Sequence, residues 1–142
     1  MSKNFSLAEM VASDTARRKG IDNTPSFEVV SHLDEFCDNL LQPLRDAWGA
    51  PINVTSGYRC HKLNQVVGGV ATSAHLRGYA ADLQISNMKK FDEFVKFVVD
   101  WIKDKPFDQC LIEKSGSTRW LHIGYKNSKD EQRSQIKDII VK

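Results

Sequence analysis

The chain has 142 residues, of which 41% are hydrophobic and 27% are charged, and its formal net charge at pH 7 is +2. That length fits one domain with a core large enough to fold unaided, and the scattered lysines and arginines argue against nucleic acid as a partner. No apolar run approaches the length of a membrane span, and the N-terminus lacks the layout of a signal peptide, so we expect a protein that is cytoplasmic as synthesised.

The cysteine pattern predicts free thiols. Cys37, Cys60 and Cys110 are odd in number, and none of them stands in a CxxC pair. We therefore expect reduced side chains rather than a disulfide framework or a zinc site built from thiolates.

The first third of the chain is predicted to be helical. Ser6-Leu7-Ala8-Glu9 has the form of a capping box and predicts a short helix that ends near Lys19-Gly20. Apolar residues then recur at helical spacing over residues 26–48, which predicts one face of a long helix. Pro43 lies inside that run and should kink it, because proline has no N–H and crowds the preceding turn. Gly49 is expected to end the helix.

The middle of the chain alternates between short strands and helices. Residues 51–56 predict a strand, and residues 60–67 a short helix that two glycines close. A loop that contains His75 precedes a second strand at residues 80–85. Residues 88–103 then form the clearest amphipathic helix, with apolar side chains on one side and lysines and acids on the other.

The last part of the chain predicts a hairpin and a tail. Residues 108–113 and 119–125 have the composition of two strands, joined by a polar, glycine-containing loop. The tail after Asn127 is predicted to be helical, because Ser128-Lys129-Asp130-Glu131 resembles a capping box. The whole pattern predicts an α+β domain, with helices packed on a small, mainly antiparallel sheet.

Three residues of this pattern are candidates for a metal site. His75 and Asp82 lie seven positions apart, and His122 stands in the predicted hairpin. Two imidazoles and a carboxylate are the ligands that zinc prefers, and three protein ligands leave one position for water, as in catalytic sites. A loop histidine and a strand-edge aspartate are the structural alternative. Asp82, however, interrupts an apolar strand, and a buried carboxylate costs several kcal/mol unless it is paired or bound to a metal.

Three further residues have a structural and a functional interpretation. Arg59 follows a predicted strand, where it either forms a surface ion pair or points its charged fork at a substrate carbonyl or carboxylate. Glu113 is either an ordinary hairpin glutamate or a general base, and on an adjacent strand it would face the same cleft as His122. Ser73 either shapes its loop or holds a terminal carboxylate of the substrate.

Four segments of the sequence together resemble the zinc D-alanyl-D-alanine carboxypeptidase family. They are Ser56-Gly57-Tyr58-Arg59, Gly68-Gly69, Ser73-x-His75-x-x-Gly78-x-Ala80-x-Asp82 and Trp120-x-His122-x-Gly124-Tyr125. The family includes phage and bacterial peptidoglycan peptidases and shares its fold with the hedgehog signalling domain. The resemblance extends over roughly residues 5–125. It is strongest to the compact single-domain subgroup of bacteria and prophages.

The resemblance implies a role for most of the candidate residues. His75, Asp82 and His122 would bind one zinc ion per chain. Arg59 would stabilise the developing oxyanion, and Ser73 would contact the substrate.

The catalytic base is where the sequence departs from some relatives. These place a glutamate three residues before the last histidine, at the position that Arg119 occupies here. The resemblance to the hedgehog-type hairpin implies that Glu113, on the preceding strand, takes its place.

We therefore predict a single zinc peptidase domain over residues 1–142, with its core at about 5–125 and a tail at 126–142. It is expected to be a monomer that hydrolyses peptidoglycan stem peptides or muropeptides next to a D-amino acid, as a carboxypeptidase or an endopeptidase. The main alternative is a non-catalytic zinc-containing binding domain of hedgehog-like fold, and a structural part of a phage particle is another. Release at lysis or export would bring the protein to the cell wall, whereas recycled fragments would reach it inside the cell.

Overall fold

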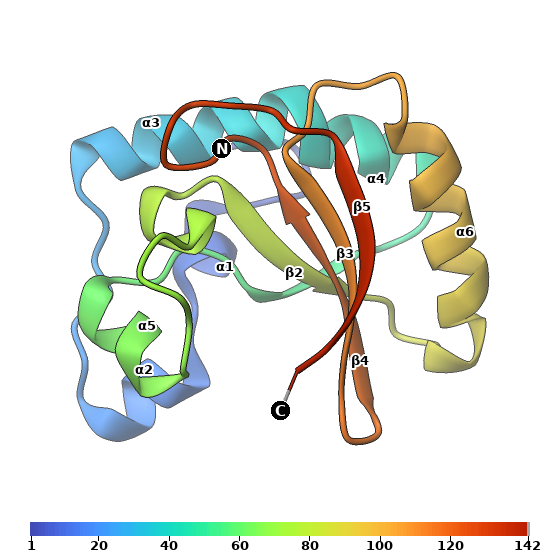
Figure 1. The fold of residues 1–142 in the computed structure, drawn as a ribbon. Helices are drawn as coiled ribbons and strands as arrows, with labels where there is room; N and C mark the ends of the chain where they lie inside the picture. The colour runs from blue at the N-terminus through green and yellow to red at the C-terminus, as the bar shows by residue number, and fades with distance from the viewer. Residues whose placement is uncertain (142) are drawn as a thin grey trace.

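The computed structural model describes residues 1–141 and contains one five-stranded sheet with the order β1-β2-β4-β3-β5 (Figure 1). The strand pairs are antiparallel except for β3 and β5, which are parallel. This arrangement confirms the predicted α+β class and the mainly antiparallel sheet. The strands are β1 (Asn53–Ser56), β2 (Ala80–Gln84), β3 (Gln109–Ser115), β4 (Thr118–Gly124) and β5 (Gln135–Ile140).

The α-helices are short, and the longest has 12 residues. The α-helices are α1 (Leu7–Val11), α2 (Asp14–Lys19), α3 (Phe27–Phe36), α4 (Gln42–Trp48), α5 (His61–Val66) and α6 (Phe91–Ile102). The described residues also form one π-helix, η1 (Cys37–Leu41), and two 3₁₀-helices, η2 (Ala74–Arg77) and η3 (Met88–Lys90). Among the described residues, no helix combines the length and the apolar character that crossing a membrane requires.

The two faces of the sheet have different environments, because neighbouring residues of a strand point to opposite sides. Leu83 of β2 and Leu121 and Ile123 of β4 point into the hydrophobic core that the sheet shares with α3, α4 and α6. Asp82 and His122 alternate with them and point to the opposite face, where they line a cleft. The alternation thus separates the core from the face that carries the polar residues.

The predicted N-terminal helix is wrong in one respect, because it is divided into two. Ser6 caps α1 as predicted by accepting a hydrogen bond from the Glu9 backbone N–H at 3.1 Å. Ala12 then has an extended backbone, and Ser13 caps α2 by accepting from the Ala16 N–H at 3.1 Å. A second N-cap inside the run therefore starts a new helix.

The long helix predicted for residues 26–48 is present as the continuous series α3, η1 and α4. Pro43 lies at the start of α4, directly after the π-helix η1. The irregularity expected at this proline is a π-turn on its N-terminal side, in which the Gln42 N–H donates to the Cys37 carbonyl. The wider turn accommodates the ring without ending the helical run.

The prediction of a helical tail is wrong, because the chain forms the edge strand β5 instead. The Asn127 side chain accepts hydrogen bonds from the Lys129 and Glu131 N–H groups, both at 2.9 Å, which closes a turn rather than starting a helix. Asp130 has a φ of +58°, a left-handed conformation that ends any helix. The isoleucine-rich segment that follows pairs with the otherwise open edge of β3.

Phe94 of α6 is expected to contribute strongly to stability. Its side chain is fully buried, and its ring meets Trp48 edge-on at 5.2 Å and Phe91 at 6.1 Å. Phe94→Ala should lower the free energy of unfolding by about 3–5 kcal/mol, because burial is lost and a cavity remains. Urea denaturation measures the loss, with Phe97→Ala as the control, since Phe97 is only partly buried on the same helix. An equal loss in the two variants would contradict the account.

Candidate metal centre

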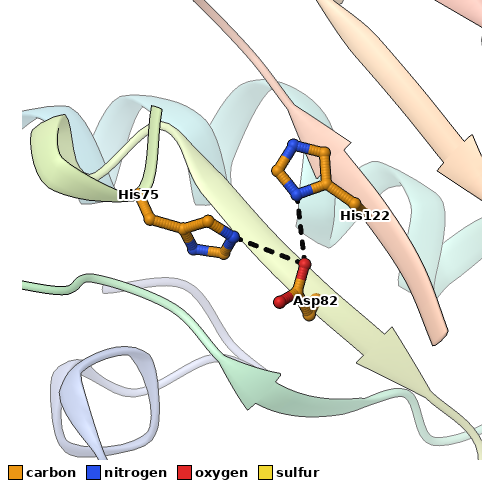
Figure 2. Close-up of side chains that lie close together, drawn as sticks. All are labelled: His75, Asp82 and His122. Atoms are coloured by element: carbon orange, nitrogen blue, oxygen red, sulfur yellow. Dashed lines mark hydrogen bonds and ion pairs between the residues drawn. The ribbon is translucent and has the colours of Figure 1, made fainter. Parts of the chain in front are cut away.

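His75, Asp82 and His122 come together on the cleft face of the sheet (Figure 2). The register of β2 and β4 places Asp82 directly opposite His122, and η2 brings His75 to the same point. Asp82 Oδ1 lies 3.3 Å from His75 Nε2 and 3.1 Å from His122 Nδ1. One carboxylate oxygen therefore lies between two imidazole nitrogens.

The ring of His75 is oriented by the backbone behind it. Its Nδ1 lies 2.6 Å from the Gly57 carbonyl oxygen, and a carbonyl can only accept, so Nδ1 carries the proton. Nε2 is then left with a lone pair directed at the cluster, an arrangement common behind metal-bound histidines. Gly57 is required for this contact, because a Cβ there would lie 2.2 Å from the Met10 carbonyl oxygen. Gly57 thus packs closely against the end of α1, and its carbonyl orients the His75 ring.

The turn that carries His75 is fixed at both of its ends. The Ser73 hydroxyl caps η2 by accepting from the His75 backbone N–H at 3.2 Å. Gly78 ends the turn with a φ of +80°, a conformation that other residues rarely adopt. Ser73 therefore has the structural role that was one of its two interpretations, and it also lines the cleft.

The charges of the cluster are set by burial and by the contacts within it. Burial alone would raise the pKa of Asp82, but the two imidazoles beside it outweigh burial and hold that pKa well below its usual range. Burial lowers the pKa of His75, although Asp82 opposes the shift. An ionised carboxylate and a neutral imidazole are the protonation states that a metal ion requires of these ligands.

The donor set fits zinc. The three side chains each offer one ligand atom, and these atoms all lie within 4.8 Å of one another. Nitrogen, oxygen and nitrogen donors from two histidines and one carboxylate are typical of catalytic zinc sites, which have three protein ligands. His75 is almost completely buried, and the Asp82 side chain is 15% exposed, so the set is shielded yet open to the cleft.

Arg59 lies beside the cluster with part of its donor capacity unused. It follows β1, and its backbone N–H donates to the His75 carbonyl at 3.1 Å. Its Nε is buried and has no hydrogen-bond partner among the described residues. Burial lowers the pKa of Arg59, while Asp82 and Glu113 favour its charged form. A guanidinium remains charged in proteins, so Arg59 is a half-buried cation that lines the cleft.

Glu113 lies next to the cluster from the adjacent strand. Its Oε1 is 3.9 Å from His122 Nδ1 and accepts a hydrogen bond from Trp120 Nε1 at 3.1 Å. Burial raises the pKa of Glu113, which makes it a better proton acceptor than an exposed glutamate. The carboxylate is thus held by the indole and lies next to the cluster of His75, Asp82 and His122.

Arg119 points away from this site. Three residues before His122 on a strand is a position on the opposite face. Its Nη1 lies 2.6 Å from Asp92 Oδ1, and its guanidinium is 5.0 Å from the centre of the Phe91 ring. In this chain a glutamate at position 119 would therefore not face the cluster.

The cluster lies in a cleft with a volume of about 730 Å³. One wall is the loop at Gly68-Gly69-Val70, which the buried Asn64 holds by donating from Nδ2 to the Val70 carbonyl at 2.9 Å. A Cβ at Gly69 would lie 2.0 Å from Asn64 Oδ1, so only glycine permits this close packing. The loop thus has a fixed conformation where it lines the cleft.

The sequence model of the peptidase M15 family matches residues 3–124, which include every residue of the cluster. The chain belongs to the peptidase M15 family. M15 peptidases are zinc-dependent metallopeptidases, and the family includes D-Ala-D-Ala carboxypeptidases. Among curated proteins, none matches the chain.

The cleft of this M15 peptidase also contains residues that sequence reasoning missed. Asn127, Arg133 and Val141 line it from the segment that was predicted to be helical. The run Ile136 to Ile140, rich in β-branched residues, was the available signal for a strand there. Which of its side chains reach the cleft depends on the parallel pairing with β3, which local sequence does not reveal.

Proposed function

We propose that this M15 peptidase hydrolyses peptide bonds in peptidoglycan stem peptides, next to a D-amino acid, with one zinc ion held by His75, Asp82 and His122. The observation that carries the proposal is the convergence of these three ligand atoms in an open cleft. Membership of a zinc peptidase family supports the reaction type. The stem peptide is inferred as the substrate from the resemblance of the sequence motifs.

The side chains around the three ligands have separate roles in peptide hydrolysis. Zinc, when bound, supplies Lewis-acid activation of water and of the scissile carbonyl. Glu113 accepts a proton at its carboxylate from the attacking water and later returns it to the leaving amine. Arg59, which lines the cleft, donates from its guanidinium to the oxygen on which negative charge develops. Ser73, whose hydroxyl oxygen accepts from the His75 backbone N–H, donates its hydroxyl hydrogen to a terminal carboxylate of the substrate.

Arg59→Lys should lower turnover sharply and leave the melting temperature nearly unchanged. Lysine keeps the positive charge but loses the planar donor fork, so an interaction made in the transition state is weakened. We expect kcat on a muropeptide to fall by about a hundredfold, as for the loss of one oxyanion-stabilising donor. Steady-state kinetics and thermal denaturation on the same preparation measure both effects. Unfolding of the variant instead would identify Arg59 as a structural residue.

Digestion of purified sacculi tests the proposed function. The zinc-loaded protein should release fragments whose new termini, identified by mass spectrometry, lie within the stem peptides. Termini at the end of the stem would define a carboxypeptidase, and termini within a cross-link an endopeptidase. Binding of muropeptides without any new terminus would favour the non-catalytic domain and overturn the proposal.

A further inference from the structure

The cleft continues beyond the metal cluster to the segment that follows β4. Asn127 and Arg133, from the connection between β4 and β5, line it together with Asp108 and Gln109 at the start of β3. The family match ends at Gly124, so Asn127 and Arg133 lie outside it. This end of the cleft is therefore formed by a segment that contributes none of the predicted zinc-binding or catalytic residues.

Arg133 is held rigidly at this place by a buried carboxylate. Its Nε donates to Asp108 Oδ1 at 2.8 Å and its Nη2 to Oδ2 at 2.9 Å, and its backbone N–H also donates to Oδ1 at 3.1 Å. The Asp108 side chain is 2% exposed, whereas that of Arg133 is 38% exposed. Of the two charged groups that line this end of the cleft, the guanidinium is therefore the accessible one.

The donors of Arg133 are not all used by Asp108. Guanidinium has five N–H donors, and its Nη1 forms no hydrogen bond to any residue that the structure describes. Both oxygens of Asp108 are already occupied, so the aspartate does not offer a ligand a competing acceptor. A rigid fork with free N–H groups is suited to a planar acceptor with two oxygens.

Asn127 adds a second donor. Its Oδ1 accepts from the N–H groups of Lys129 and Glu131, which fixes which end of the amide is oxygen. The Nδ2 end is left without a partner among the described residues. Gln109 donates from Nε2 to Gln135 Oε1 at 3.1 Å, so its own side-chain oxygen is still able to accept a hydrogen bond. The free groups here are thus mainly donors, with one acceptor that suits a peptide N–H.

We propose that Arg133, oriented by Asp108 and assisted by Asn127, determines specificity by binding a free carboxylate of the peptide substrate away from the scissile bond. This inference rests on the proposed function and names the substrates that the site selects, which are stem peptides with a free acid rather than its amide. A carboxylate offers two acceptors to these donors. A carboxamide offers one and sets its own NH₂ against them, which is unfavourable in a partly enclosed site.

The test uses two muropeptides that differ only in one stem carboxyl group, free in one and amidated in the other. The parent enzyme should have a kcat/KM at least about tenfold higher for the free acid, the size of effect expected for a charge-assisted hydrogen bond. Arg133→Gln should reduce this ratio to about one by slowing the acid substrate alone. Arg119→Gln is the matched control, because Arg119 lies on the other face of the sheet, and it should keep the parent ratio.

A second variant and a binding measurement keep the test decisive. Asp108→Asn combined with Arg133→Gln replaces the ion pair by two neutral amides, so no unpaired carboxylate remains buried, and it should also abolish the preference. Calorimetry of both peptides with Glu113→Gln, with and without Arg133→Gln, measures the same ratio as Kd. If the parent cleaves neither peptide, the proposed function fails, whereas a Kd ratio that depends on Arg133 still supports this inference. Equal Kd values for the two peptides, or no binding of either, would overturn it.

Discussion

Replacing Glu113 by glutamine is expected to lower kcat on a muropeptide by at least about a hundredfold, the lower end of what removal of a general base usually costs. Glutamine keeps the shape and can still accept the hydrogen bond that Trp120 Nε1 donates to Oε1 of the glutamate. It cannot accept the proton from water. The zinc content should remain that of the parent, because Glu113 is not one of the three converging ligands.

The control for this variant is Glu93→Gln, an exposed glutamate on α6 that makes the same chemical change far from the cleft. Its kcat should equal that of the parent. Steady-state kinetics and metal analysis of the three proteins decide the matter. Full activity in Glu113→Gln would mean that another group removes the proton.

Each of the variants His75→Ala and His122→Ala is expected to lose most of the bound zinc. The parent should contain close to one zinc ion per chain, and removing one of three protein ligands leaves too few donors for tight binding. His61→Ala is the matched control, since His61 is exposed at the start of α5 and should not affect the metal. Metal analysis after dialysis gives the ratio directly.

Thermal denaturation provides an independent measure of the same site. Zinc that binds only the folded parent should raise its melting temperature, and a chelator should reverse the rise. Neither addition should move the melting temperature of His75→Ala or His122→Ala appreciably. Retention of stoichiometric zinc by both variants would exclude them as ligands.

The candidate residues His75, Asp82 and His122 could be identified from the sequence because they stand in segments with strong local signals. Asp82 interrupts an apolar strand, and a charge in that position needs a partner, which the structure provides as two imidazoles. The pairing of Asp82 with His122 across β2 and β4 was not predictable, because it depends on a register between segments 40 residues apart. The types of the donor residues could thus be predicted from the sequence, whereas their convergence in space could be known only from the structure.

The errors at the two ends of the chain have a common cause. In each case a side chain competes locally with the capping pattern that predicts one helix. Ser13 supplies a second cap within the first helical run, and Asn127 uses its side chain to close a turn where a helix was predicted to start. The tail then pairs with β3, and a tertiary contact of this kind outweighs weak local propensity. The missed strand is also why Arg133 was missed.

X-ray anomalous scattering from crystals of the zinc-loaded protein, recorded on both sides of the zinc absorption edge, tests the metal centre most directly. The account predicts one strong peak per chain, at about 2.0–2.2 Å from a ligand atom of each of His75, Asp82 and His122. A peak bound by other side chains, or no peak in protein that hydrolyses muropeptides, would contradict it.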